Sequence, residues 1–97
     1  MRKYEIMVLI DPDTDDRQVA PMLDKHLETI TNEGGTVDNI DLWGKRKLAY
    51  DINKKSEAFY AVINLTAEPA SIQEMDRLMT INEQIIRTKV LRPDLHA

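Results

Sequence analysis

Five of the eleven side chains from Lys45 to Lys55 are positively charged, and Asp51 is the one acid among them. Two aromatic residues, Trp43 and Tyr50, accompany this cluster. Cations neutralise phosphates, and aromatic rings stack on bases or on apolar surfaces, so the segment could contact a nucleic acid. An edge strand that lysines keep soluble would have a similar composition. The segment alone leaves both interpretations open.

The charges of the chain are unevenly distributed. The formal net charge is −4, yet ten of the thirteen basic residues fall in three groups. These groups are Arg2 with Lys3, the segment from Lys45 to Lys55, and Arg87 with Lys89 and Arg92. Residues 11–41 instead hold nine acids against two basic residues. Because local potential governs binding more than total charge does, we expect one acidic and one basic side.

Length and composition indicate a single soluble domain. The chain has 97 residues and no cysteine, which excludes disulfides and thiolate metal sites. No apolar run is long enough to span a bilayer, and no secretion signal is apparent. A cytoplasmic protein with one domain over residues 1–93 and a short tail over residues 94–97 is therefore expected.

The hydrophobic pattern predicts six elements. Leu48, Tyr50 and Ile52 alternate with polar or small residues, as a strand with one covered face would. Val19, Leu23 and Ile30 recur at helical spacing, with Gly34 and Gly35 as a stop signal. Gly44 interrupts the long second strand and suggests a bulge. The expected order is strand 4–10, helix 15–32, strand 36–53, a turn over 54–57, strand 58–66, a helix that begins at 68–71, and strand 85–91.

This order, βαββαβ, predicts an α+β ferredoxin-like sandwich, a four-stranded antiparallel sheet with two helices on one face. Strand alternation assigns the side chains to two faces. The residues expected toward the helices are Ile6, Val8, Ile10, Phe59, Ala61, Ile63, Leu65, Ile86 and Val90. Those expected on the open face are Lys3, Glu5, Met7, Leu9, Tyr60, Val62, Arg87 and Lys89.

Two expectations follow for the binding surface. The first and last strands of this fold are antiparallel neighbours, so their basic ends should meet in one patch. The residues of this patch would be Arg2, Lys3, Lys89 and Arg92. Met7, Leu9 and Val62 also make the open face apolar enough to suggest a partner.

Catalytic and metal sites find little support. Asp11, Asp13 and Asp15 imitate the start of a calcium loop, but the required glycine and terminal glutamate are missing, so helix capping is the better interpretation. His26 and His96 have no second ligand at metal spacing. The loop after the first strand is acidic and would repel the phosphate that an acylphosphatase-like enzyme of this topology binds. No enzyme, cofactor or metal site is expected.

An RNA-recognition motif shares the predicted topology and stacks bases on aromatic residues of its central strands. Here Met7 and Leu9 occupy the corresponding part of the first strand, and only Tyr60 of the third strand is expected to face outward. Backbone and shape recognition of folded RNA therefore fits better than sequence-specific reading of a single strand.

Two segments carry a resemblance to a known family. The opening Met1-Arg2-Lys3-Tyr4-Glu5-Ile6 and the block from Trp43 to Lys54 closely resemble ribosomal protein S six of the bacterial small subunit. The similarity is collinear through Arg92. The chain departs from the family at Ala58, where relatives often have glycine, and at Asp51, often proline.

The resemblance implies a structural ribosomal protein in the cytoplasm that binds the central domain of 16S ribosomal RNA together with ribosomal protein S eighteen. The expected RNA contacts are Arg2, Lys3, Tyr4, Arg46, Lys47, Arg87, Lys89 and Arg92. The expected contacts with the protein partner are Trp43, Leu48 and Tyr50, and Arg46 and Lys47 could also serve this partner. Hydrophobic support of the long strand is the other interpretation of Trp43 and Tyr50. A non-ribosomal module that self-associates through its open sheet face is the alternative function.

Overall fold

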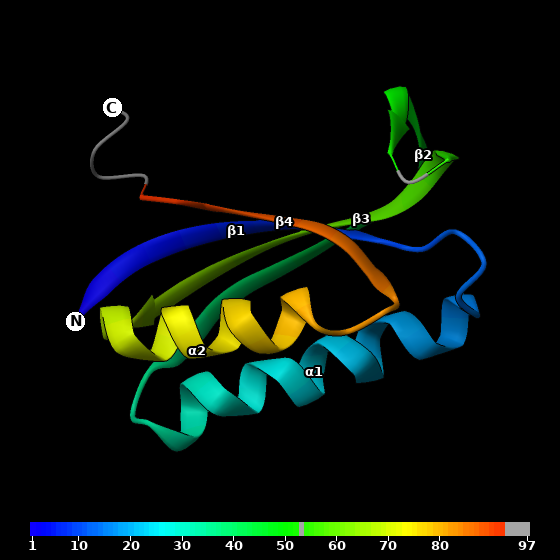
Figure 1. Ribbon diagram of the computed structural model, residues 1–97. Helices are drawn as coiled ribbons and strands as arrows, with labels where there is room; N and C mark the ends of the chain where they lie inside the picture. The colour runs from blue at the N-terminus through cyan, green and yellow to red at the C-terminus, as the bar shows by residue number, and fades with distance from the viewer. Residues whose placement is uncertain (53, 93–97) are drawn as a thin grey trace.

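The computed structural model describes residues 1–52 and 54–92, which form one sheet covered by two helices (Figure 1). The elements are β1 (Arg2–Ile10), α1 (Asp16–Asn32), β2 (Thr36–Ile52), β3 (Lys55–Ala67), α2 (Pro69–Thr80) and β4 (Ile85–Leu91). The strand order is β2-β3-β1-β4, and all three pairings are antiparallel. Both helices lie on the same side of the sheet (Figure 1). The predicted ferredoxin-like sandwich is confirmed.

Local signals set the limits of α1. Asp15 stands at the N-cap, and its carboxylate accepts a hydrogen bond from the backbone N–H of Arg17 at 2.9 Å. This confirms capping as the role of that carboxylate. At the other end, the backbone N–H of Gly35 donates to the carbonyl of Ile30, and Gly34 has a φ of 89°. The chain can therefore turn into β2 directly after the helix.

The core lies between the sheet and the helices. Val19, Leu23, Leu27 and Ile30 of α1 are buried, whereas His26 beside this stripe is half-buried and lies 2.9 Å from the side-chain amide of Asn82. The buried residues of the three sheet strands beneath are Tyr4, Ile6, Val8, Ile10, Phe59, Ala61, Ile63, Leu65, Ala67 and Ile85. The face assignment is confirmed for the predicted core residues of β1 and β3, and Val90 packs partly buried against them.

The assignment of Ile86 to the core was wrong. Arg87 pairs with Leu9, but Ile10 pairs with Ile85, so the register shifts by one residue at Ile86. This bulge reverses the alternation that the sequence pattern assumed. Ile85 takes the core position and is 7% exposed, while Ile86 is half-buried outside the core cluster.

The β2–β3 hairpin contains the predicted irregularity and a larger one. The register shifts between Leu42 and Gly44, which confirms a bulge in the middle of β2. Farther along, Lys47 pairs with Glu57 and Ile52 pairs with Lys55, so residues 48–51 of β2 stand opposite Ser56 alone. This excess of β2 residues bends the end of the hairpin away from the sheet, on the side opposite the helices (Figure 1). We call the described residues of this end, 45–52 and 54–58, the arm.

The predicted turn over residues 54–57 was too long. Because Ile52 pairs with Lys55, only two residues connect the strands, and β3 begins at Lys55 rather than at residue 58. Lys54 has a φ of 65°, the left-handed conformation that lets a hairpin reverse in two residues.

No helix in residues 1–52 and 54–92 is long and apolar enough to cross a membrane. The predicted domain end at residue 93 and the predicted tail over residues 94–97 lie outside the described residues.

Candidate RNA and protein interface

The basic residues near the ends of β1 and β4 are divided between the two faces of the sheet. Arg87 and Lys89 lie on the open face, where they pair across the strands with Leu9 and Met7. Arg92 instead lies beside the buried ring of Tyr4, with its guanidinium carbon 5.9 Å from the ring centroid. Since Tyr4 belongs to the core cluster, Arg92 lies on the helix side.

The prediction of one continuous patch was therefore wrong, because strand alternation separates its members. Arg2 shares the strand parity of Tyr4, whereas Lys3 shares that of Met7 on the open face. Hydrogen bonds from Thr66 and Thr36 lower the pKa of the Asp38 carboxyl, and the charge of Lys3 nearby acts in the same direction.

Tyr4 is unsuited to the predicted role of an RNA contact. Its side chain is 6% exposed and packs in the core. The ring therefore supports the sheet and the neighbouring Arg92, and it does not belong to the binding surface. Its place on the covered face follows from the same alternation that buries Ile6 and Val8.

Trp43 and Arg46 form an ordered pair at the base of the arm. The ring of Trp43 stacks on Tyr60 with centroids 6.1 Å apart and planes 3° from parallel. Arg46 lies over the ring of Trp43, with its guanidinium carbon 5.6 Å from the ring centroid. The Nε of Arg46 donates to the Trp43 carbonyl at 3.5 Å. The indole N–H donates to Asp41 at 2.9 Å. Trp43 is still 41% exposed, so it supports the strand and also presents part of its ring to solvent.

Other cations of the cluster are held in different ways. Lys45 lies over the ring of Phe59, with its ammonium 5.2 Å from the centroid. Lys47 is exposed and stands across the strands from Glu57. Lys55, near the tip of the arm, lies 2.9 Å from Asp13 and 3.8 Å from Asp11.

The Lys55 contact ties the arm to the loop between β1 and α1. The hydrogen bond and the charge of Lys55 lower the pKa of Asp13. The hydrogen bond to Asp13 in turn raises the pKa of Lys55, and the charges of Asp11 and Asp13 add to this effect. Lys55 is therefore partly neutralised and serves the arm more than an external phosphate. Sequence reasoning missed this contact because the two carboxylates are distant in the chain.

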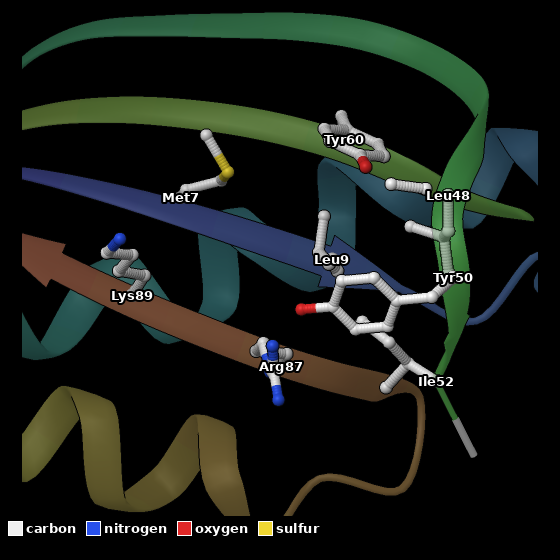
Figure 2. A pocket seen from close by; sticks show the side chains of 9 residues that line it. Met7, Leu9, Leu48, Tyr50, Ile52, Tyr60, Arg87 and Lys89 are labelled. Atoms are coloured by element: carbon white, nitrogen blue, oxygen red, sulfur yellow. The ribbon is translucent and has the colours of Figure 1, made fainter.

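The arm and the open face enclose a hollow of about 210 Å³. Its lining residues are Met7, Leu9, Leu48, Ala49, Tyr50, Ile52, Tyr60, Arg87 and Lys89. Figure 2 shows Tyr50 and Ile52 projecting from the arm toward Leu9 and Arg87, and Leu48 projecting toward Tyr60. We call this space the open-face hollow. It brings together two residues predicted for the partner, Leu48 and Tyr50, and two predicted for RNA, Arg87 and Lys89.

The hollow explains much of the apolar open face. Leu9 is only 7% exposed although it points away from the helices, because the arm covers it. Tyr50 remains 67% exposed at the rim. Sequence reasoning did not assign Ile52 to the binding surface, although its alternation with Leu48 and Tyr50 was visible in the sequence.

Among residues 1–52 and 54–92, no group of three or more acidic or histidine side chains is arranged as a metal site would require. Cations that lie over aromatic rings, together with an apolar hollow on the open face, are features that fit a binding domain, because such surfaces suit phosphates and apolar partner segments.

Comparison with known proteins gives the family. Residues 3–92 match the family model described as Ribosomal protein S6. The chain is 62% identical to small ribosomal subunit protein bS6 of Cutibacterium acnes over 99% of this chain and 100% of the relative, and 63% identical to that of Micrococcus luteus over 97% and 93%. The crystal structure of 30S ribosomal protein S6 from Thermotoga maritima has a TM-score of 0.88, with 29% identity over 98% of this chain and 91% of the other. The chain belongs to the Ribosomal protein S6 family.

Membership confirms the predicted class, a ribosomal protein of the small subunit, and with it the location on the cytoplasmic ribosome. The fold alone is more widespread. The C-terminal domain of the MgtC protein from Mycobacterium tuberculosis has a TM-score of 0.60 to this chain at 13% identity, over 95% of this chain and 87% of the other.

Proposed function

We propose that this protein is a structural component of the small subunit that binds the central domain of 16S ribosomal RNA together with ribosomal protein S eighteen. The family supports the ribosomal role, and the distribution of cations supports a limited RNA surface on an acidic protein. A more basic companion would supply the remaining phosphate contacts.

The RNA contacts in this proposal are the basic residues outside the hollow, namely Arg2, Lys3, Arg46, Lys47 and Arg92. Trp43, Leu48 and Tyr50 serve the protein partner. Arg87 and Lys89 line the open-face hollow and border both surfaces.

The stacked pair of Trp43 and Arg46 carries the proposal. A guanidinium that is held on an exposed aromatic ring loses little conformational freedom when it binds a phosphate. The ring itself is fixed by Tyr60 and by its hydrogen bond to Asp41. An edge strand that needed only solubility would not require this arrangement.

Binding to a central-domain fragment of 16S ribosomal RNA tests the proposal. The fragment is titrated with this chain, with S eighteen, and with both, at several salt concentrations. We expect the two proteins together to bind more tightly than either alone, and we expect affinity to fall as salt rises. A chain that forms a tight homodimer and binds neither the RNA nor S eighteen would contradict the proposal and favour the self-associating module.

A further inference from the structure

We propose that the groove between α1 and β2 is a docking site for an amphipathic helix of another protein, one that carries lysine or arginine beside its apolar face. The groove has a volume of about 270 Å³ and lies on the helix side of the sheet, whereas the arm bends toward the other side. The inference therefore depends on neither the RNA nor S eighteen. We call this space the α1–β2 groove.

One wall of the α1–β2 groove belongs to an apolar row on the edge strand β2. Val37, Ile40 and Leu42 each stand directly opposite a core residue of β3, so they point to the helix side. A register shift between Val37 and Asn39 keeps the row on that side. Val37 and Ile40 line the groove, and Leu42 continues the row beyond it. Ile40 and Leu42 are 39% and 47% exposed, so α1 and α2 leave them largely uncovered.

The opposite wall of the groove is acidic. Asp24, Glu28 and Thr31 follow one another along α1 at spacings of four and three residues, so they share one face of the helix. Asp24 and Glu28 are exposed, and within the described part of the chain neither forms an ion pair. Anything that covers the apolar row must approach these two carboxylates. They attract lysine or arginine and repel the phosphates of RNA.

The spacing of the carboxylates favours a helix as the occupant. Residues four apart are separated by about 6 Å along a helix axis. Cations four residues apart on a helix beside α1 match this separation, and the adjacent face of that helix places apolar side chains on Ile40 and Leu42. The docked helix would join α1 and α2 in the layer that covers one side of the sheet (Figure 1).

Fluorescence anisotropy of synthetic peptides with the full chain tests the inference. The probe is a labelled peptide of alanine, leucine and lysine, about 18 residues long so that it can form a helix, with lysines flanking a stripe of leucines. A second peptide has glutamate in place of every lysine. A third contains the same residues as the probe in an order that alternates leucine with lysine, the pattern of a strand.

A double variant tests the acidic wall. Asp24→Asn with Glu28→Gln removes both carboxylates, and its matched control is Asp51→Asn with Glu83→Gln, which removes two exposed acids outside the groove. All four positions are exposed, so both double variants are expected to fold. We expect the groove variant to raise the dissociation constant of the probe about threefold to tenfold, through the loss of two charge pairs. The control should bind the probe much as the unchanged chain does.

A single variant tests the apolar row. Leu42→Thr removes apolar surface and keeps a residue that suits a strand, and its matched control is Ile81→Thr after α2 (47% and 65% exposed). We expect Leu42→Thr to raise the dissociation constant about fivefold, and Ile81→Thr to leave it unchanged. A loss of affinity in the double variant but not in Leu42→Thr would reveal only a general attraction of cations to the acidic side, and the inference would be wrong.

The peptides give the remaining outcomes. We expect the unchanged chain to bind the probe and not the glutamate peptide. A probe that does not bind, or that binds the groove variants as well as their controls, overturns the inference. Tighter binding of the strand-patterned peptide would mean that the occupant extends the sheet at β2, which also overturns it. If the unchanged chain self-associates and Leu42→Thr abolishes this association, the occupant is a second copy and the inference fails.

Discussion

The indole ring of Trp43 lies parallel to the ring of Tyr60, with 3° between their planes and 6.1 Å between their centroids. This stack connects the bulge of β2 to the open face of β3, and Arg46 lies on its outer side. One aromatic pair thus fixes both the base of the arm and the position of a cation.

Replacing Trp43 tests the structural part of this relationship. Trp43→Ala should lower the free energy of unfolding by about 1 kcal/mol, the usual contribution of an aromatic pair, with some further loss of packing. Trp43→Phe keeps a stacked ring and should lose less. Urea denaturation measures both. Equal stabilities for the alanine variant and the unchanged chain would show that the stack contributes nothing to folding.

Replacing Arg46 tests its proposed phosphate contact. Arg46→Ala should weaken binding to the 16S RNA fragment and reduce the slope of log affinity against log salt by about 1, because one fewer counterion is released. Arg77→Ala is the matched control, since Arg77 is exposed on α2 and pairs with Glu74 at 2.6 Å. A slope that Arg46→Ala leaves unchanged would remove Arg46 from the RNA surface.

Two glycines should resist substitution for different reasons. A Cβ at Gly35 would lie 2.8 Å from the Ile30 side chain and 2.8 Å from the backbone oxygen of Thr66, so Gly35→Ala should destabilise by about 1–3 kcal/mol through crowding. At Gly44 a Cβ meets nothing within 4 Å, but φ is 80°, so Gly44→Ala should lose about 1–2 kcal/mol through backbone strain.

Asparagine distinguishes the two causes, because it tolerates the left-handed conformation better than alanine does. Gly44→Asn should recover part of the stability that Gly44→Ala loses. Gly35→Asn should be no better than Gly35→Ala. Thermal unfolding of the four variants provides the comparison, and a recovery at Gly35 would contradict the crowding explanation.

The contact between Lys55 and Asp13 should make stability depend on acidity. The pKa of Asp13 is lowered in the folded chain by its hydrogen bond and charge contact with Lys55. A lowered carboxyl pKa adds stability above the unfolded pKa of about 4, and this stability is lost as the pH falls through the folded value. Lys55→Met should therefore be less stable than the unchanged chain at neutral pH, and the difference should shrink below about pH 4.

Lys25→Met is the control for this pH dependence, because it removes an exposed lysine elsewhere. Unfolding by urea at several pH values gives the comparison. A difference between Lys55→Met and the unchanged chain that stays constant down to the acid limit would mean that Asp13 is not its source.

Most of the fold could be predicted because the local signals agreed with one another. The apolar run of β1, the stripe from Val19 to Ile30 and the aspartate cap each indicated their elements independently. The ferredoxin-like order then determined which strands are neighbours. Ile86 was misplaced because a single-residue bulge against β1 leaves no mark in the hydrophobic pattern of β4.

The candidate site could be predicted only in part. Composition located the cations of β2 and the apolar open face, but their three-dimensional relation depends on residues 48–51 standing opposite Ser56 alone. An alternating strand pattern assigns each side chain to one face of the sheet. It does not show in which direction the extra residues bend the strand. The same limitation hid the separation of Lys89 from Arg92, because Arg92 follows the end of β4.

The contact of Lys55 with Asp11 and Asp13 makes the opening of the open-face hollow sensitive to salt. The tip of the arm is held near β1 and α1 by charges that are themselves accessible to water. Dissolved ions compete with such contacts, so the width of the opening of the open-face hollow, between the arm and Leu9, depends on the salt concentration. Dilute buffers should keep the opening narrow, and concentrated salt should let the arm swing outward.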